Sequence, residues 1–416
     1  MKGHSRGLGR LAGALTLGLV ATGCGGSDVS AGAESDAVNL NRCYGADCGV
    51  RAQSLGGEAI AAQPCGDVEG PLADPVLFEG IQPGVTALAA VAGDEGSVWA
   101  LLSEGGGRYG YATINLVHYA ADGTRLASQP VGEQSEHSVL RAAVAVDEAD
   151  RVTLGLYSSY APNADSEVTE VLELSSFDGD LNLLDTPLRF RGVAEPLLQG
   201  GPGGSIWLAG RAQANAFHGV VSRISEREPD WIQTAVPASG NAIGVSGLAV
   251  ADDGTSAVLA GLTPRWSGTG PNILQLGIAT FDASGKPVWT LKLPTEFTPG
   301  FVPALGGTAQ GDLIVAGAVG EHGSQLRVQQ FSRQGEPGWA YQMESSSVGV
   351  EVQRKSGRAV VSAGNGVAVI DAAGETCRRF SVAVDEESMA AAEPWRSDGE
   401  YFLAVGSGLA RFRVPE

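Results

Sequence analysis

A repeating unit of about 40–55 residues, the size of a four-stranded propeller blade, restricts the fold of this chain more than any other feature. Each unit reads as an apolar strand, a Gly/Asp turn, a strand often ending in Ala-Gly, a variable loop, a third strand, a second turn and a fourth strand often containing Trp. The clearest copy spans residues 245–293, with turns at Asp252-Asp253-Gly254 and at Asp282 to Lys286. Unit starts fall near residues 86, 139, 193, 245, 301, 348 and 388.

Seven such units predict an all-β fold, a seven-bladed β-propeller of four-stranded blades over residues 76–416. The last unit is short, because only three strands fit before the sequence stops at Glu416. We expect residues 76–79 to supply its missing outer strand. Borrowing that strand closes the ring and removes an exposed sheet edge.

The quoted units, above all Asp282-Ala-Ser-Gly-Lys-Pro-Val-Trp289, resemble the bacterial propeller repeats called SBBP and, less closely, quinoprotein (PQQ-type) and kelch repeats. The resemblance implies a propeller whose tryptophans dock neighbouring blades. It does not carry over the quinone cofactor, because the vicinal cysteine pair of quinoprotein dehydrogenases is absent. No cofactor is therefore expected, and a fold resemblance of this kind does not assign a function.

The N-terminus has the form of an export signal. Lys2, Arg6 and Arg10 precede an uncharged apolar stretch, residues 11–21, that is shorter than the roughly 20 residues of a membrane-spanning helix. Ala21-Thr22-Gly23-Cys24 resembles the lipobox of bacterial lipoproteins, which implies a signal peptide over residues 1–23 and lipid attachment to Cys24. Ordinary secretion without lipid is the alternative. Gly25, in place of the Asp that favours inner-membrane retention, implies the outer membrane of the cell envelope where the cell has one.

The stretch between the anchor and the propeller reads as two parts, a flexible tether over residues 24–42 and a cysteine-bearing leader over residues 43–75. Four cysteines follow Cys24, namely Cys43, Cys48, Cys65 and Cys377. An even number of cysteines in an exported chain indicates disulfides. Three pairings are possible, and we favour Cys43–Cys48 with Cys65–Cys377 over a zinc site, since no C-x-x-C occurs. The second pair joins the leader to the far end of the chain. We therefore expect the anchor to meet the propeller near its seam, the junction between the last and the first repeat.

Charge and motifs exclude several kinds of chemistry. A net charge of −20 opposes binding to nucleic acid. The sequence contains no P-loop and no H-E-x-x-H, and its one G-x-S-x-G lies in the signal peptide. Asp178-Gly-Asp180-Leu-Asn182 has the acidic spacing of a calcium loop, but Leu183 stands where such a loop needs glycine. We interpret it as a polar turn, and we predict no metal and no catalytic residues.

A binding surface is predicted on the face that carries the loops between second and third strands. These loops are long and contain aromatic and arginine residues, which are frequent anchors of recognition surfaces. The candidates are Arg108, Tyr109, Tyr111, Tyr157, Tyr160, Arg265 and Trp266. The leading hypothesis is a monomeric envelope binding or scaffold protein for protein or glycan. The alternatives are a propeller lyase or hydrolase with an axial metal, and a spacer without a ligand.

Overall fold

The structure, a computed structural model, consists of short strands joined by turns. It describes residues 37–39, 53–56, 60–72, 76–81, 85–105, 112–134, 138–160, 169–191, 193–212, 219–225, 228–235, 241–263, 266–267, 270–271, 275–294, 297, 303–320, 324–344, 349–353, 356–363, 366–382, 393–395, 401–405 and 409–413. Within these ranges no helix is long and apolar enough to cross a membrane.

The described strands form seven sheets of four or five strands, here called sheets 1 to 7 in chain order. Sheet 1 contains β6 (Val85–Ala92), β7 (Val98–Gly105), β8 (Ala112–Tyr119) and β9 (Arg125–Gln134). Sheet 2 contains β10 (Ser138–Val146), β11 (Val152–Tyr160), β12 (Thr169–Phe177) and β13 (Leu188–Arg191). Sheet 3 contains β14 (Val193–Gly200), β15 (Ile206–Ala212), β16 (Gly219–Ser225) and β17 (Glu228–Ala235).

The remaining sheets follow the same plan. Sheet 4 contains β18 (Asn241–Val250), β19 (Ser256–Thr263), β22 (Gln275–Phe281) and β23 (Pro287–Lys292). Sheet 5 contains β24 (Ala304–Gly307), β25 (Leu313–Val319), β26 (Gln325–Phe331) and β27 (Pro337–Glu344). Sheet 6 contains β28 (Gly349–Val352), β29 (Ala359–Ala363), β30 (Gly366–Ile370) and β31 (Cys377–Ser381). Sheet 7 contains β32 (Glu393–Trp395), β33 (Tyr401–Val405), β34 (Leu409–Arg413) and β5 (Val76–Leu77). A separate hairpin pairs β20 (Trp266–Ser267) with β21 (Gly270–Pro271).

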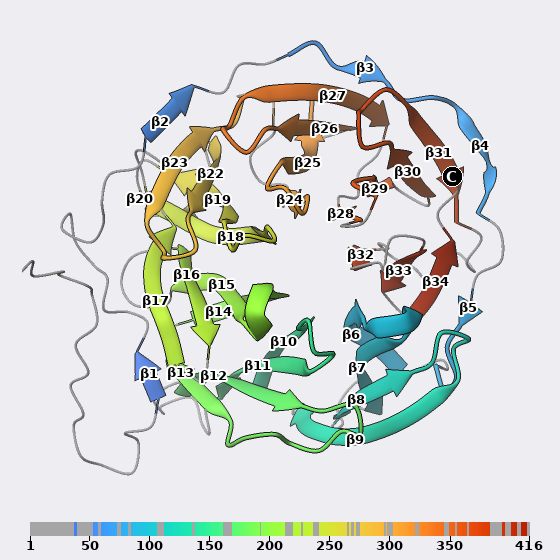
Figure 1. Cartoon of the computed structure of the whole chain (residues 1–416), viewed down its shortest axis with the longest axis vertical. Helices are drawn as coiled ribbons and strands as arrows, with labels where there is room; N and C mark the ends of the chain where they lie inside the picture. The colour runs from blue at the N-terminus through green and yellow to red at the C-terminus, as the bar shows by residue number, and fades with distance from the viewer. Residues whose placement is uncertain are drawn as a thin grey trace, which may run out of the picture.

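The sheets stand around a common axis, with the first strand of each nearest that axis (Figure 1). The first strands contact one another in the order β6, β10, β14, β18, β24, β28 and β32, and β32 contacts β6 again. The fold is therefore a β-propeller, and the predicted all-β chain of repeated four-stranded units is confirmed. The first strands begin within about five residues of the expected unit starts, a scatter normal for sequence-based boundaries.

The expected edge strand is present in sheet 7. Val76 and Leu77 of β5 pair antiparallel with Arg411 and Ala410 of β34, so the sheet gains its fourth described strand from the N-terminal side of the chain. Phe78 follows at once and packs edge-on against Tyr119 of sheet 1, with ring centroids 5.0 Å apart. The segment therefore joins the last sheet to the first.

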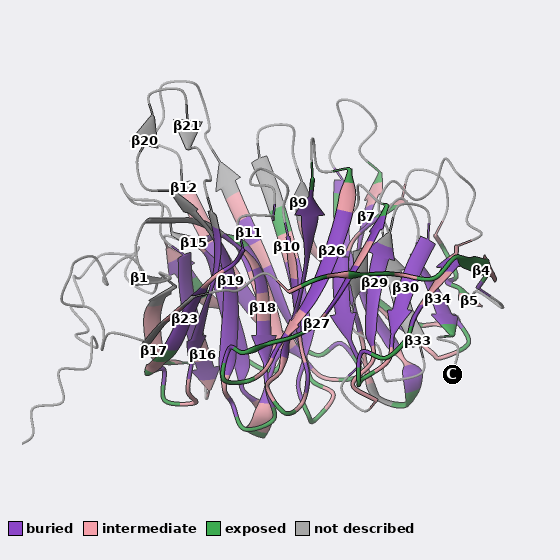
Figure 2. Ribbon diagram, turned by 90° about the horizontal axis from the view of Figure 1, so that it is seen from above, coloured by how far each residue is buried: buried purple, intermediate pink, exposed green. Residues whose placement is uncertain are grey.

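The hydrophobic core is divided among the contacts between neighbouring sheets. In the described part of the chain, seven clusters of buried apolar side chains occur, one at each contact between neighbours. Middle strands are covered on both faces, so they are almost continuously apolar rather than alternating. β25, Leu-Ile-Val-Ala-Gly-Ala-Val, is buried at every residue. Figure 2 shows these buried strands between two faces that carry the connections.

The two faces differ in their connections. One face, here called the turn face, carries the tight turns that join first to second and third to fourth strands; the other, here called the loop face, carries β20, β21 and the remaining connections (Figure 2). On the turn face, Asp282 accepts hydrogen bonds at Oδ1 from the backbone N–H groups of Ser284 (2.9 Å) and Lys286 (3.0 Å). Asp178 caps its own turn in the same way, by accepting from Asp180 and Asn182. The stretch from Asp178 to Asn182 is therefore a turn, as interpreted from the sequence.

Aromatic side chains on fourth strands dock against glycines in the turns of the next sheet. The Trp231 indole donates from Nε1 to the Ala283 carbonyl (3.2 Å), beside Gly285, and the Trp289 indole donates to the Arg333 carbonyl (2.9 Å), beside Gly335. Each glycine adopts a positive φ. A Cβ atom at Gly285 would overlap the Trp231 ring, and one at Gly335 would overlap Leu55 and touch the Trp289 ring at 3.5 Å. Trp339 of sheet 5 lies against Gly374 of sheet 6 in the same manner.

The contact between sheets 1 and 2 has neither the tryptophan nor the glycine. In sheet 2 the turn has the same hydrogen bonds, but Leu181 stands at the glycine position with φ 65°. The outer strand of sheet 1 has no tryptophan, and its Ala127 packs in the same cluster as buried Leu181. A leucine side chain thus fills the space that the missing aromatic ring would occupy.

The N-terminal belt, defined as β1 (Ala37–Asn39), β2 (Gln53–Gly56), β3 (Gln63–Pro64) and β4 (Val68–Pro71), was not expected. Its strands pair in parallel with the outer strands β13, β23, β27 and β31, so sheets 2, 4, 5 and 6 gain a fifth strand (Figure 1). The expected tether over residues 24–42 is therefore interrupted at β1. The first described pairing of the N-terminal segment is with sheet 2 and not at the junction of sheets 7 and 1. Strands at a sheet edge can pair through backbone groups alone, so a polar, glycine-rich sequence gives no warning of them.

No described belt strand covers the outer strands β9 of sheet 1, β17 of sheet 3 and the two-residue β5 of sheet 7, and the two long ones, β9 and β17, each contain a proline within the strand. Pro130 and Pro229 both lie at register shifts in the ladder. Proline offers no N–H to an incoming strand and is confined to edges and bulges for that reason. These two edges are therefore poor templates for pairing with another chain.

The glycine contacts give the first test. Gly374→Ala should lower the free energy of unfolding by about 2–4 kcal/mol, because it adds both left-handed strain and overlap with Trp339. Gly203→Ala is the matched control. Gly203 has nearly the same φ (66° against 68°) but no atom within 4 Å of an added Cβ, so about 1 kcal/mol is expected. Denaturant unfolding measures both, and equal losses would contradict the docking role of this glycine.

Candidate functional site

The predicted binding residues fall into three groups in the structure. Arg108, Tyr109, Tyr111 and Arg265 lie outside the described residues. For Tyr160, at the end of β11, and for Trp266, in β20, the structure describes only the backbone. Tyr157 is the one candidate whose side chain is described.

Tyr157 belongs to the core, which corrects its assignment to an exposed binding face. Its side chain is 5% exposed and packs in the cluster between sheets 2 and 3 that contains Leu172 and Phe190. The prediction was wrong because β11 continues to Tyr160, so Tyr157 is still in a strand. Alternation along β11 then directs it toward sheet 3, on the opposite face from Leu154, which packs between sheets 1 and 2.

An exposed ion pair lies at the start of β14, where the chain enters sheet 3 from the loop face. Arg211 Nη2 lies 3.6 Å from Glu195 Oε1, and both side chains are substantially exposed. Glu195 has φ 53° and stands in a bulge of β14. Gly210 makes the bulge possible, because a Cβ there would lie 2.9 Å from the Ala194 carbonyl oxygen. This pair was not predicted from the sequence, although the recurring Ala-Gly at the end of second strands indicates such close approaches.

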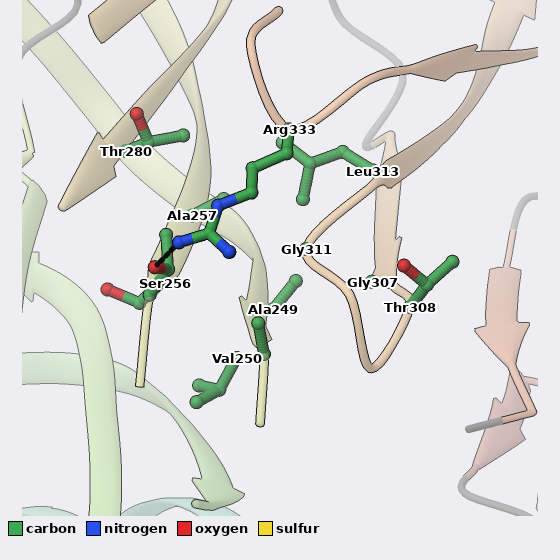
Figure 3. Close-up of a pocket in the computed structure, with 12 residues that line it drawn as sticks. Ala249, Val250, Ser256, Ala257, Thr280, Gly307, Thr308, Gly311, Leu313 and Arg333 are labelled. Atoms are coloured by element: carbon green, nitrogen blue, oxygen red, sulfur yellow. Dashed lines mark hydrogen bonds between the residues drawn. The ribbon is translucent and has the colours of Figure 1, made fainter. Parts of the chain in front are cut away.

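A small pocket lies on the turn face between sheets 4 and 5 (Figure 3). Arg333 of sheet 5 reaches across it to Asp253 and Thr255 of sheet 4, as the pairing of their side chains shows. The buried Thr280 hydroxyl bonds with the Trp289 backbone, and Thr308 accepts from the Asp312 N–H (3.0 Å). The described lining contains the hydroxyl groups of Thr255, Ser256, Thr280 and Thr308 and the guanidinium of Arg333, but no carboxylate or imidazole. We describe the pocket as a joint between two sheets.

Several specific contacts join the N-terminal segment to sheets 5 and 6. Cys65 and Cys377 form a disulfide with a Cα–Cα distance of 5.1 Å across a sequence separation of 312 residues. This is the pairing favoured from the sequence; Cys43 and Cys48 lie outside the described residues. In the chain-entropy model a crosslink over so long a loop stabilises the fold by about 5–6 kcal/mol.

Three charged side chains add to this attachment. Arg378 donates to both carboxylate oxygens of Glu69 in β4, at 2.9 and 2.7 Å, which holds the pKa of Glu69 below its usual value. Buried Arg327 donates to the Ile60 carbonyl (2.6 Å), where the belt passes from sheet 4 to sheet 5.

Arg411 acts at the seam between sheets 7 and 1. Its guanidinium is buried and donates to the Gly96 carbonyl (2.6 Å) and to the Ala121 carbonyl, both in turns of sheet 1. Bonds from a charged donor to backbone carbonyls are stronger than neutral ones. The sequence signal is a lone arginine within the apolar run Leu409-Ala-Arg-Phe, a residue for which no role was predicted.

The geometry also bears on metal and acid–base chemistry. Among the described side chains, no three His, Cys, Asp or Glu residues gather as metal ligands would. His118 stacks on Trp99 with centroids 3.8 Å apart, and burial lowers its pKa. We therefore assign His118 to packing.

Comparison with known proteins adds no assignment. No family model and no curated protein matches the chain. Two solved structures match with a TM-score of 0.43: a protein of unknown function from Dyadobacter fermentans (10% identity, covering 74% of this chain and 96% of that one) and the WD40 domain of SCAP from fission yeast (9%, 82% and 97%). XC5397 from Xanthomonas campestris, a gluconolactonase, matches with a TM-score of 0.39 (14%, 85% and 99%). Likenesses this weak assign no activity to this chain.

The seam gives a pH-dependent test. Burial raises the pKa of Tyr119 to about 12, and its hydroxyl donates to the Glu79 carbonyl (3.0 Å). Since the folded pKa is above the unfolded value, the stability from Tyr119 is complete below about pH 10 and is lost as the pH rises toward 12. Tyr119→Phe should cost about 1 kcal/mol at pH 7, and this deficit should shrink above pH 10. Urea unfolding of both proteins from pH 7 to 11 measures it; a constant deficit would contradict the assignment.

Proposed function

We propose that this protein is an exported lipoprotein, anchored to the cell envelope by lipid on Cys24, that presents a closed, seven-bladed propeller as a monomeric binding scaffold for an envelope protein or glycan. The seven sheets would be its blades, and β5 the strand that closes the ring. The observation that carries the proposal is the division of surfaces: the N-terminal belt lies along the rim at sheets 2, 4, 5 and 6, and the turn face carries turns whose polar groups bond within the turn, as at Asp282 and Asp178. We therefore place the ligand site on the loop face.

The predicted contact residues on that face are now Arg108, Tyr109, Tyr111, Tyr160, Arg265 and Trp266, without the buried Tyr157. Loops held by a rigid scaffold are frequent sites of recognition. Aromatic and arginine side chains bury large areas and donate hydrogen bonds, so protein or glycan surfaces suit them. The net charge of −20 opposes nucleic acid.

The belt also defines where the proposed anchor leaves the body. β1 pairs with the outer strand of sheet 2, and Ala37 is the first residue that the structure describes in this pairing. A fully extended chain from Cys24 to Ala37 spans at most roughly 45 Å. This length keeps the rim of sheet 2 within roughly 45 Å of the lipid surface. The proposed outer-membrane location follows from Gly25.

The anchor is tested by labelling. In a bacterium that processes lipoproteins, the wild-type chain should incorporate labelled palmitate and sediment with membranes, because each buried CH₂ contributes roughly 0.8 kcal/mol. Cys24→Ser should abolish both, whereas Cys43→Ser should abolish neither. Label retained by Cys24→Ser would reject the proposed anchor.

The binding face is tested by capture of defined probes. Tyr160→Ala with Trp266→Ala should reduce capture of envelope protein or of immobilised envelope glycan at least tenfold, a loss of about 1.4 kcal/mol or more. The matched control is Gln334→Ala with Glu336→Ala, two exposed residues of one turn on the opposite face. Equal capture by both double variants, or a loss confined to the control, would reject the loop face.

A further inference from the structure

Cys65 divides the N-terminal segment into two sections that serve different purposes. Before it, β1, β2 and β3 add a fifth strand to sheets that already possess four. After it, β5 is one of only four described strands of sheet 7. Loss of the first section leaves complete sheets, whereas loss of β5 removes a strand and uncovers Phe78, which is 5% exposed.

The section before Cys65 is held by short pairings. β1 pairs over three residues, β2 over four and β3 over two. Arg327 adds its hydrogen bond to the Ile60 carbonyl. A single backbone hydrogen bond contributes about 0.5–1.5 kcal/mol. A pull on the N-terminal end therefore opens these pairings in succession, before the sheets themselves yield.

We infer that the Cys65–Cys377 disulfide is a mechanical stop, which ends the peeling of the belt and keeps load off the strand that completes sheet 7. Peeling cannot pass a covalent bond, so the force enters β31 through Cys377, which is buried between sheets 5 and 6. The contacts beyond the stop then carry no load. They include the pair of Glu69 with Arg378, the bond from Leu72 N–H to the Ser381 carbonyl (2.8 Å), and β5 itself.

Reduction removes the stop. When a dithiol such as dithiothreitol supplies two electrons and two protons, the two sulfurs become separate thiols and peeling can proceed through β4 to β5. The seam is then opened from its N-terminal side. This inference goes beyond the proposed function, because it holds for any load on the N-terminal end and does not depend on a lipid or a ligand.

Single-molecule force measurements on the full chain test the inference. One handle is attached at the N-terminus and the other at Gln334, an exposed turn residue of sheet 5. The oxidised protein should release on the order of 100 Å of chain between Ala37 and Cys65 and then stop. Adding dithiothreitol while the molecule is held at this stop should release a further 50–60 Å, roughly the chain from Cys65 to Ile81, followed by unfolding of sheets at low force.

Two results would overturn the inference: an oxidised molecule that extends past Cys65 without a stop, or a reduced molecule that still stops there. The protein with Cys43→Ser and Cys48→Ser is the matched control, since it retains the stop and assigns any effect of reduction to the Cys65–Cys377 bond. Reduction is applied after folding, so the test does not require a variant without this disulfide to fold.

Discussion

The packing of an aromatic side chain of one sheet on a glycine turn of the next is the interaction on which the rest of this structure depends. A single four-stranded sheet cannot bury both of its faces, so each sheet here relies on its neighbours for its core. Trp231, Trp289 and Trp339 fix the distance and the angle at three of these contacts. Once the angle is fixed, the sheets must follow one another around an axis, and the last is brought back to the first.

The contact between sheets 1 and 2 shows that this geometry matters more than the residue types that achieve it. Leu181 accepts a left-handed backbone and fills the place of an absent ring with its own side chain. The cost of the conformation, about 1–2 kcal/mol, is set against the burial of a whole leucine, which contributes roughly 1.5–3 kcal/mol. At the three tryptophan contacts the large residue is on the outer strand and the small one is in the turn. Here the small residue, Ala127, is on the outer strand and the large one, Leu181, is in the turn.

Much of this fold was accessible from the sequence, because the turns and the docking tryptophans leave a side-chain pattern. Asp282 to Trp289 predicts its turn and its contact with the next sheet, and the short last unit pointed to Val76 and Leu77. The belt left no such pattern, since edge pairing uses backbone groups that every residue shares. The site was predicted less well. Tyr157 was misassigned because the length of β11 is decided by its neighbours in the sheet, and Glu195 reaches its position through a bulge.

Pro130 and Pro229, in the outer strands β9 and β17, have a consequence for a protein anchored to a membrane, as we propose. Molecules tethered to one surface diffuse in two dimensions, and they meet rim to rim far more often than the same number of molecules in solution. An open strand on each rim would let such encounters grow into lateral ladders of chains. Pro130 and Pro229 interrupt the two long outermost strands, β9 and β17, and the other described outermost strands, β1 to β5, are only two to four residues long. A membrane could therefore be densely covered with these molecules while each of them remained separate.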